Sequence, residues 1–87
     1  MQLRVRDLPE DERPRERLML NGSRALSNAE LLAIILRSGS RRENIIDLSK
    51  RLLKEHDLKA LSQMRVSELT KIFGIGEAKA CQIVACF

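Results

Sequence analysis

The stretch that decides the fold is Leu69–Ile83, which reads L-T-K-I-F-G-I-G-E-A-K-A-C-Q-I. Two glycines, Gly74 and Gly76, stand between two segments whose apolar residues recur at helical spacing. Glycine permits the backbone conformations of a tight turn and leaves the surface of the turn bare of side chains. Ile75 is expected to lie between the two helices as a plug. The pattern therefore predicts a helix–hairpin–helix over residues 66–87.

This hairpin predicts a site for phosphate groups. The N–H groups of Gly74, Gly76 and Ala78 would be unpaired at the positive end of the second helix dipole, and Lys79 would add a charge one turn in. The carboxylate of Glu77 would oppose a phosphate there. The candidate DNA-phosphate-binding residues are Gly74, Ile75, Gly76, Ala78 and Lys79. Contact of this kind has no sequence preference, and a G-I-G hairpin can also be a plain turn that binds no nucleic acid.

The composition favours helices throughout. Apolar residues make up 44% of the 87 residues, and Phe73 and Phe87 are the only aromatics. Leucine and alanine favour helices, and the aromatic enrichment typical of sheets is missing. We expect an all-α fold, with a compact domain of five to six helices over residues 14–87 and an extended N-terminal arm over residues 1–13.

Start and stop signals divide the domain into helices. Pro14 suits a first helical turn, Gly22 a helix end, and Ser27 with Glu30 forms a capping box. The expected helices are 14–21; a central helix that starts after Ser27, contains Leu31–Leu36 and stops at Gly39; 43–56; 58–63, capped by Asp57; 66–73, with Leu69, Ile72 and Phe73 inward; and 77–87, with Ala80, Ile83, Val84 and Phe87 in an apolar stripe.

A weaker helix–turn–helix signal lies upstream, around the turn that follows Leu36. Arg37, Arg41 and Arg42 stand at this turn and are candidate secondary basic contacts to DNA. The turn is either a degenerate partner of the G-I-G hairpin or a solvated turn whose arginines do nothing specific.

Charge and cysteine usage narrow the class of protein. The formal net charge of +4 permits contact with nucleic acid without requiring it. No apolar run is long enough for a membrane span and no signal core opens the chain, so we expect a cytoplasmic protein. Cys81 and Cys86 lack metal-ligand spacing, so neither a metal site nor a cofactor is expected. The chain stops at Phe87 in mid-helix, from which we expect a fragment of a longer protein.

Three stretches resemble the N-terminal domain of the RadC family, which was named for DNA repair. They are D-L-P-E-D-E-R-P-R-E-R-L (Asp7–Leu18), A-L-S-N-A-E-L-L-A-I-I-L-R-S-G (Ala25–Gly39) and F-G-I-G-E-A-K-A (Phe73–Ala80). The resemblance implies a C-terminal JAB-type metalloprotease-like domain with an H-x-H and Asp metal set. The sole histidine here is His56, so no residue of that set is found in this chain.

The helical core is also similar to that of endonuclease III-type DNA glycosylases. Those enzymes place a lysine two residues after the second hairpin glycine, where this chain has Ala78. The expected function is therefore non-catalytic binding of the DNA backbone. The alternative is a structural or protein-interaction module that docks on the C-terminal domain of the longer protein or on another partner.

Overall fold

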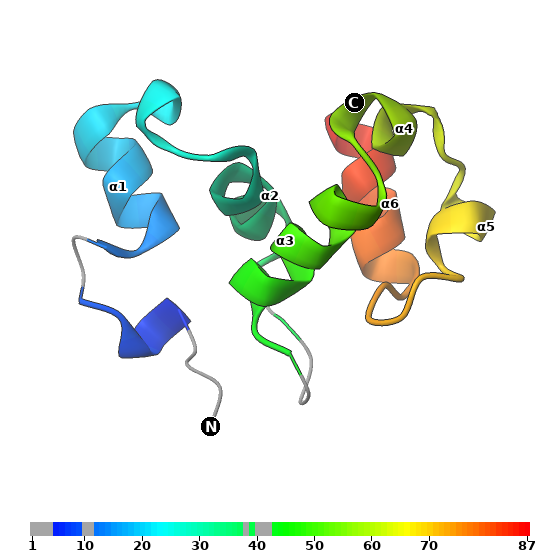
Figure 1. Ribbon diagram of the computed structural model, residues 1–87, viewed down its shortest axis with the longest axis horizontal. Coiled ribbons are helices and arrows are strands. Elements are labelled where there is room, and N and C mark those ends of the chain that lie inside the picture. The colour runs from blue at the N-terminus through cyan, green and yellow to red at the C-terminus, as the bar shows by residue number, and fades with distance from the viewer. Residues whose placement is uncertain (1–4, 10–11, 38, 40–42) are drawn as a thin grey trace.

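Helices form wherever the sequence carries capping residues. The computed structural model describes residues 5–9, 12–37, 39 and 43–87, and that part of the chain is helical without strands. The elements are η1 (Val5–Asp7), α1 (Pro14–Asn21), η3 (Ser23–Ala25), α2 (Asn28–Leu36), α3 (Ile45–Glu55), α4 (Leu58–Gln63), α5 (Val66–Leu69) and α6 (Glu77–Cys86), as Figure 1 shows. The prediction of an all-α fold with five to six helices is confirmed.

Side-chain caps begin three of these helices. Ser27 Oγ accepts a hydrogen bond from the Glu30 N–H at 3.2 Å, and the Glu30 carboxylate accepts one from the Ser27 N–H at 3.1 Å. Asn44 caps α3 through the Asp47 N–H at 2.8 Å, and Asp57 caps α4 in the same way. The capping box and the Asp57 cap are confirmed as predicted.

The predicted stop of α2 at Gly39 is wrong. The helix ends at Leu36, and Arg37 takes the left-handed φ of +73° that ends it. A glycine is needed at position 39 for a different reason, because a Cβ there would lie 2.2 Å from the Glu43 carbonyl oxygen. The glycine therefore lets the loop pass close to the backbone that leads into α3.

The helix expected over residues 66–73 is also wrong beyond Leu69. From there the chain makes tight turns, in which Ile72 donates to the Leu69 carbonyl and Ile75 to the Ile72 carbonyl, both at 3.0 Å. Arg65 gives α5 no side-chain cap, because a guanidinium has no acceptor, and only the Glu68 carboxylate accepts the Arg65 N–H. A short, half-capped helix followed by turns redirects Phe73 away from the core.

The extended arm predicted for residues 1–13 differs where the structure describes it. Val5–Asp7 form a turn of 3₁₀-helix instead of an extended strand. Arg13 explains this, because its guanidinium donates to the carbonyls of Leu8 at 3.1 Å and Arg6 at 3.0 Å. Two hydrogen bonds from one side chain fold the segment back toward the start of α1.

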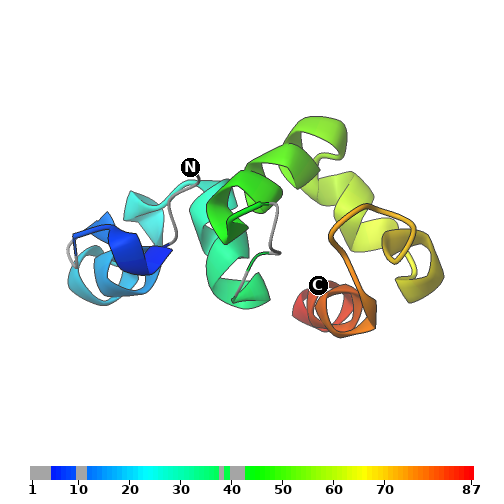
Figure 2. The ribbon, with the colours of Figure 1, turned by 90° about the horizontal axis from the view of Figure 1, so that it is seen from below.

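The core joins helices from both halves of the chain. Figures 1 and 2 show α1 and the N-terminal segment at one end, α2 and α3 in the middle, and α4–α6 at the other end. As predicted, α2 is central, since it contacts α1, α3 and α6. The buried cluster holds apolar residues from α2 onward, namely Leu32, Ala33, Leu36, Ile45, Leu48, Leu52, Leu61, Leu69, Ile75, Ala80 and Ile83. Of the apolar stripe predicted for α6, Ala80 and Ile83 are buried as expected, whereas Val84 and Phe87 are exposed.

The Glu30 carboxylate gives the fold a pH dependence. Its partial burial would raise its pKa, but hydrogen bonds from the Ser27 backbone and from the Arg17 guanidinium outweigh this and lower the pKa below the ordinary 4.5. A lowered pKa in the folded state stabilises the fold above the unfolded pKa, and this stabilisation is lost as pH falls through the folded value.

We therefore expect Glu30→Gln to lower stability at pH 7 by a few tenths to about 1 kcal/mol. The difference from wild type should shrink as pH falls below the ordinary value, because the wild-type carboxyl then becomes neutral as well. Thermal unfolding of both proteins across this pH range measures it. A difference that stays constant down to low pH would contradict the role of the charged carboxylate.

Candidate nucleic-acid interface

The G-I-G hairpin connects the turns after α5 to the first turn of α6. Gly74 has a φ of +91°, which a residue with a side chain rarely adopts. Ile75 is 3% exposed and belongs to the core cluster, as the sequence predicts. Gly76 precedes α6 with extended backbone, and a Cβ there would meet no atom within 4 Å. Only the second glycine therefore leaves an open surface.

Gly74 differs from the expectation that both glycines are bare. A Cβ at Gly74 would lie 3.2 Å from Leu48 Cδ1 and 3.3 Å from Arg51 Nη2. This side of the turn therefore packs on α3. The lack of a side chain at Gly74 lets the hairpin approach α3 closely, in addition to permitting the positive φ.

Backbone donors gather at the open side of the hairpin. Within the described ranges, no carbonyl or side chain accepts the N–H groups of Gly76, Glu77 or Ala78. Gly76, Glu77 and Ala78 are exposed and Lys79 is half-buried. The N–H of Ile75, in contrast, is used within the turn. Of the residues predicted to bind phosphate, Gly76, Ala78 and Lys79 thus share one open surface, while Ile75 supports it from below.

An interaction that sequence reasoning missed fixes the hairpin to α3. The Arg51 guanidinium forms two hydrogen bonds with the Glu43 carboxylate, at 3.1 and 3.0 Å, and a third with the Phe73 carbonyl. We call this group the Arg51 bridge. The bonds to Glu43 hold the pKa of Arg51 above its ordinary value, so the bridge stays charged.

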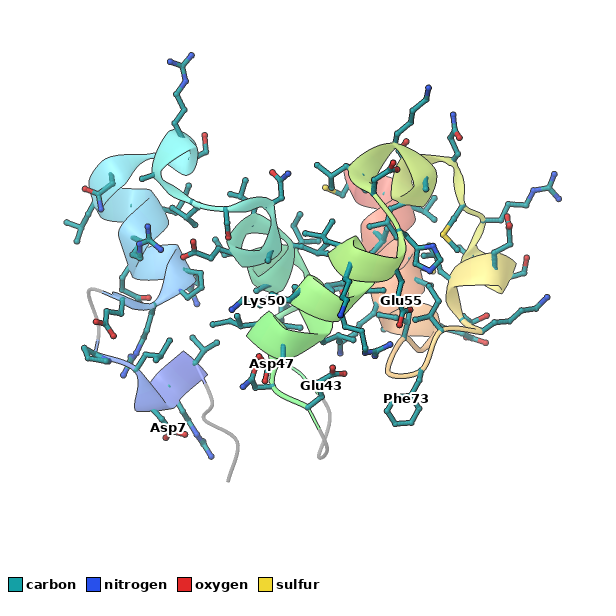
Figure 3. All side chains as sticks on the ribbon, in the orientation of Figure 1. Asp7, Glu43, Asp47, Lys50, Glu55 and Phe73 are labelled. Carbon is teal, nitrogen blue, oxygen red and sulfur yellow. The ribbon has the colours of Figure 1, made fainter. Side chains whose placement is uncertain are left out.

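Phe73 covers the bridge from outside. The prediction that its ring points inward is wrong, because the ring is 59% exposed. Its centroid lies 5.8 Å from the Arg51 guanidinium carbon, within the range of a cation–π contact. Figure 3 shows the ring projecting below the hairpin. The only sequence signal for this arrangement is an arginine on the polar face of α3, which does not reveal its partner.

Of the three arginines at the upstream basic turn, the structure describes Arg37. Arg37 is exposed at the end of α2 and lines a cleft together with residues of α1 and of the N-terminal segment. Arg41 and Arg42 lie outside the described residues. Among the described residues that line this cleft with Arg37, none belongs to the hairpin.

A metal site and a membrane span each require features that the described ranges lack. No three His, Cys, Asp or Glu side chains there gather closely enough to hold a metal ion. Cys81 and Cys86 are free and exposed. No helix within the same ranges has both the length and the apolar character for a membrane span.

Comparison of the sequence with known proteins identifies the family of this chain. The family model described as UPF0758 N-terminal matches residues 5–81. The chain belongs to the UPF0758 family. UPF0758 proteins from Methanosarcina mazei and Methanococcoides burtonii are 59% and 57% identical to it, over 98% and 99% of its length. A UPF0758 protein from Clostridium acetobutylicum is 57% identical over 95% of the chain.

The chain spans only 37–38% of the length of these UPF0758 relatives. The shared region includes the hairpin and the residues of the Arg51 bridge, since the family model covers both. No solved structure matches the chain.

Proposed function

We propose that this chain is a non-catalytic module that binds the DNA backbone without sequence preference, within a RadC-like protein of the UPF0758 family. The supporting observation is the set of unaccepted N–H groups at Gly76, Glu77 and Ala78, on a surface where Gly76 adds no side chain. Such donors at the start of a helix suit a phosphate, which the helix dipole also attracts.

Charges near the hairpin support the same proposal in part. Lys79 lies in the first turn of α6 and Lys71 is exposed in the turn before the hairpin. The Glu77 and Glu43 carboxylates oppose a phosphate, although Glu43 is neutralised by Arg51. Because these charges partly cancel, we expect weak binding, with a dissociation constant on the order of 10⁻⁴ to 10⁻⁶ M for a single non-specific module.

The double variant Lys79→Glu with Gly76→Ala tests the proposal. Both changes suit the fold, because the Gly76 backbone is extended and a glutamate in the first turn favours a helix. We expect the affinity for a labelled DNA duplex to fall about tenfold or more, with helicity unchanged. Fluorescence anisotropy at two salt concentrations measures the affinity, and circular dichroism measures the helicity.

Lys59→Glu is the matched control. It makes the same change of charge at an exposed position near the start of α4, away from the hairpin. A hairpin site predicts a much smaller loss for this variant. Undiminished binding by the double variant, or equal losses for both proteins, would exclude the hairpin as the site.

The second candidate is a protein-interaction module that docks on the remainder of the longer relatives or on another partner. The exposed side chains of Val84 (41%) and Phe87 (52%), at the end of α6, favour it. No binding of wild type to duplex or branched DNA at low salt would favour this candidate. For either function we propose a cytoplasmic setting, which suits the free thiols of Cys81 and Cys86.

A further inference from the structure

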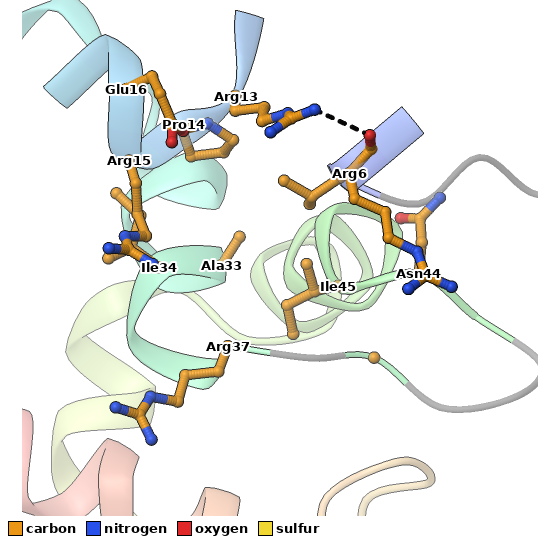
Figure 4. A pocket seen from close by; sticks show the side chains of 12 residues that line it. Arg6, Arg13, Pro14, Arg15, Glu16, Ala33, Ile34, Arg37, Asn44 and Ile45 are labelled. Atoms are coloured by element: carbon orange, nitrogen blue, oxygen red, sulfur yellow. Dashed lines mark hydrogen bonds between the residues drawn. The ribbon is translucent and has the colours of Figure 1, made fainter. Parts of the chain in front are cut away.

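A cleft lies away from the hairpin, between the N-terminal segment, α1, the end of α2 and the start of α3. Its volume is about 850 Å³, within the range of ligand-binding clefts. Its apolar lining comes from separate segments, namely Val5, Pro14, Ala33, Ile34 and Ile45. Figure 4 shows Ala33 and Ile45 between the surrounding polar side chains. The cleft shares no residue with the hairpin.

Four arginines and a single glutamate surround this apolar floor. Arg6, Arg15 and Arg37 are exposed, and Arg13 is half-buried. Arg13 uses two of its donors on the Leu8 and Arg6 carbonyls, so the cleft wall on that side is held in place. In Figure 4 the guanidinium groups of Arg6, Arg13 and Arg15 lie on different sides of the floor, and that of Arg37 extends outward from the end of α2. The margin of the cleft is therefore positively charged.

Arg37 lines this cleft with its backbone in a strained conformation. It is the non-glycine residue with positive φ in the described part of the chain, with φ 73° and ψ −64°. Glycine would take this conformation without strain, and strained residues cluster at binding sites. Arg37 is therefore the residue of the cleft at which a substitution can be tested without adding strain.

We propose that the cleft binds a peptide segment of a partner protein in which an aliphatic side chain is flanked by carboxylates. The aliphatic side chain fills the space over Ala33 and Ile45, and the carboxylates pair with the guanidinium groups. Arginine pairs carboxylates through two parallel hydrogen bonds. Nucleic acid fits less well, because its backbone has no apolar group for the floor and no aromatic side chain lines the cleft for base stacking.

The test titrates the 87-residue chain with a labelled synthetic peptide that has a central leucine between glutamates. We expect saturable binding, with shifts of the Ala33, Ile34 and Ile45 methyl signals in NMR spectra. A peptide with serine for leucine, and another with glutamines for glutamates, should each bind about tenfold more weakly. Equal binding of all three peptides, or unmoved methyl signals, would overturn the proposal.

Arg37→Gly separates this binding from folding. It removes one guanidinium and relieves the strained φ, so the thermal midpoint should be equal to wild type or higher while peptide affinity falls about fivefold. Arg24→Ala removes the same charge from η3, outside the cleft, and should leave the affinity unchanged. Unchanged peptide affinity in Arg37→Gly would contradict the proposal. A result in which duplex DNA shifts the methyl signals of the cleft and the peptide does not would also contradict it.

Discussion

Replacing Ile75 with alanine is expected to lower the free energy of unfolding by about 2–4 kcal/mol. The Ile75 side chain is 3% exposed and lies in the core cluster with Leu69, Ala80 and Ile83. Its loss leaves a cavity in this cluster, and the turns that flank Ile75 limit how far the surroundings can collapse. For a domain of this size the thermal midpoint should fall by about 10 °C or more, as measured by circular dichroism.

Val84→Ala is the matched control for this variant. It also shortens an aliphatic side chain on the same part of the chain, but Val84 is 41% exposed. Its effect should stay within about 0.5 kcal/mol, as for most surface changes. Similar midpoints for the two variants would show that Ile75 is not part of the core.

The second large effect is expected for Arg51→Ala, which removes the Arg51 bridge. The Glu43 side chain is 18% exposed and would lose its partner, and the Phe73 carbonyl would lose a donor. We expect a loss of about 1–3 kcal/mol in the free energy of unfolding. Because the hairpin would no longer be held on α3, DNA affinity should also fall, by roughly three- to tenfold.

Two further variants separate the bridge from simple charge. Lys54→Ala removes one positive charge from an exposed position on α3 and should change stability little. Arg51→Lys keeps the charge but cannot make the paired bonds to Glu43, so it should recover only part of the loss. Full recovery by lysine, or an equal loss in Lys54→Ala, would contradict the geometry assigned to the bridge.

Local signals predict the starts of helices well in this chain. The capping box at Ser27 and Glu30, the Asp57 cap and the end of α1 at Gly22 all lie where the sequence predicts them. Each depends on groups no more than four residues apart, so each is visible in a short stretch of sequence. The position of Ile75 in the core is predictable for the same reason.

The wrong predictions concern residues whose conformation depends on contacts that no local motif encodes. Gly39 is required by its close approach to the backbone of Glu43 within the same loop, which is not a capping motif. Phe73 is turned outward where Arg51, 22 residues earlier, donates a hydrogen bond to its carbonyl. Helical periodicity assigns Phe73 to the core because it contains no information on that partner. Among the candidate site residues, Gly76 and Ala78 are exposed at the open side of the hairpin, whereas Gly74 approaches α3 closely. Arg37 lines the cleft described above.

The Arg51 bridge and the contact of Gly74 with Leu48 have a consequence for how the hairpin forms. The hairpin takes its shape from α3, so an isolated peptide of residues 66–87 lacks the partners that orient it. The proposed binding surface exists only in the fraction of molecules that are folded. Any ligand bound by the hairpin therefore raises the melting temperature of the whole domain. Destabilising substitutions in the core of α3 lower the apparent affinity for that ligand, although they do not contact it.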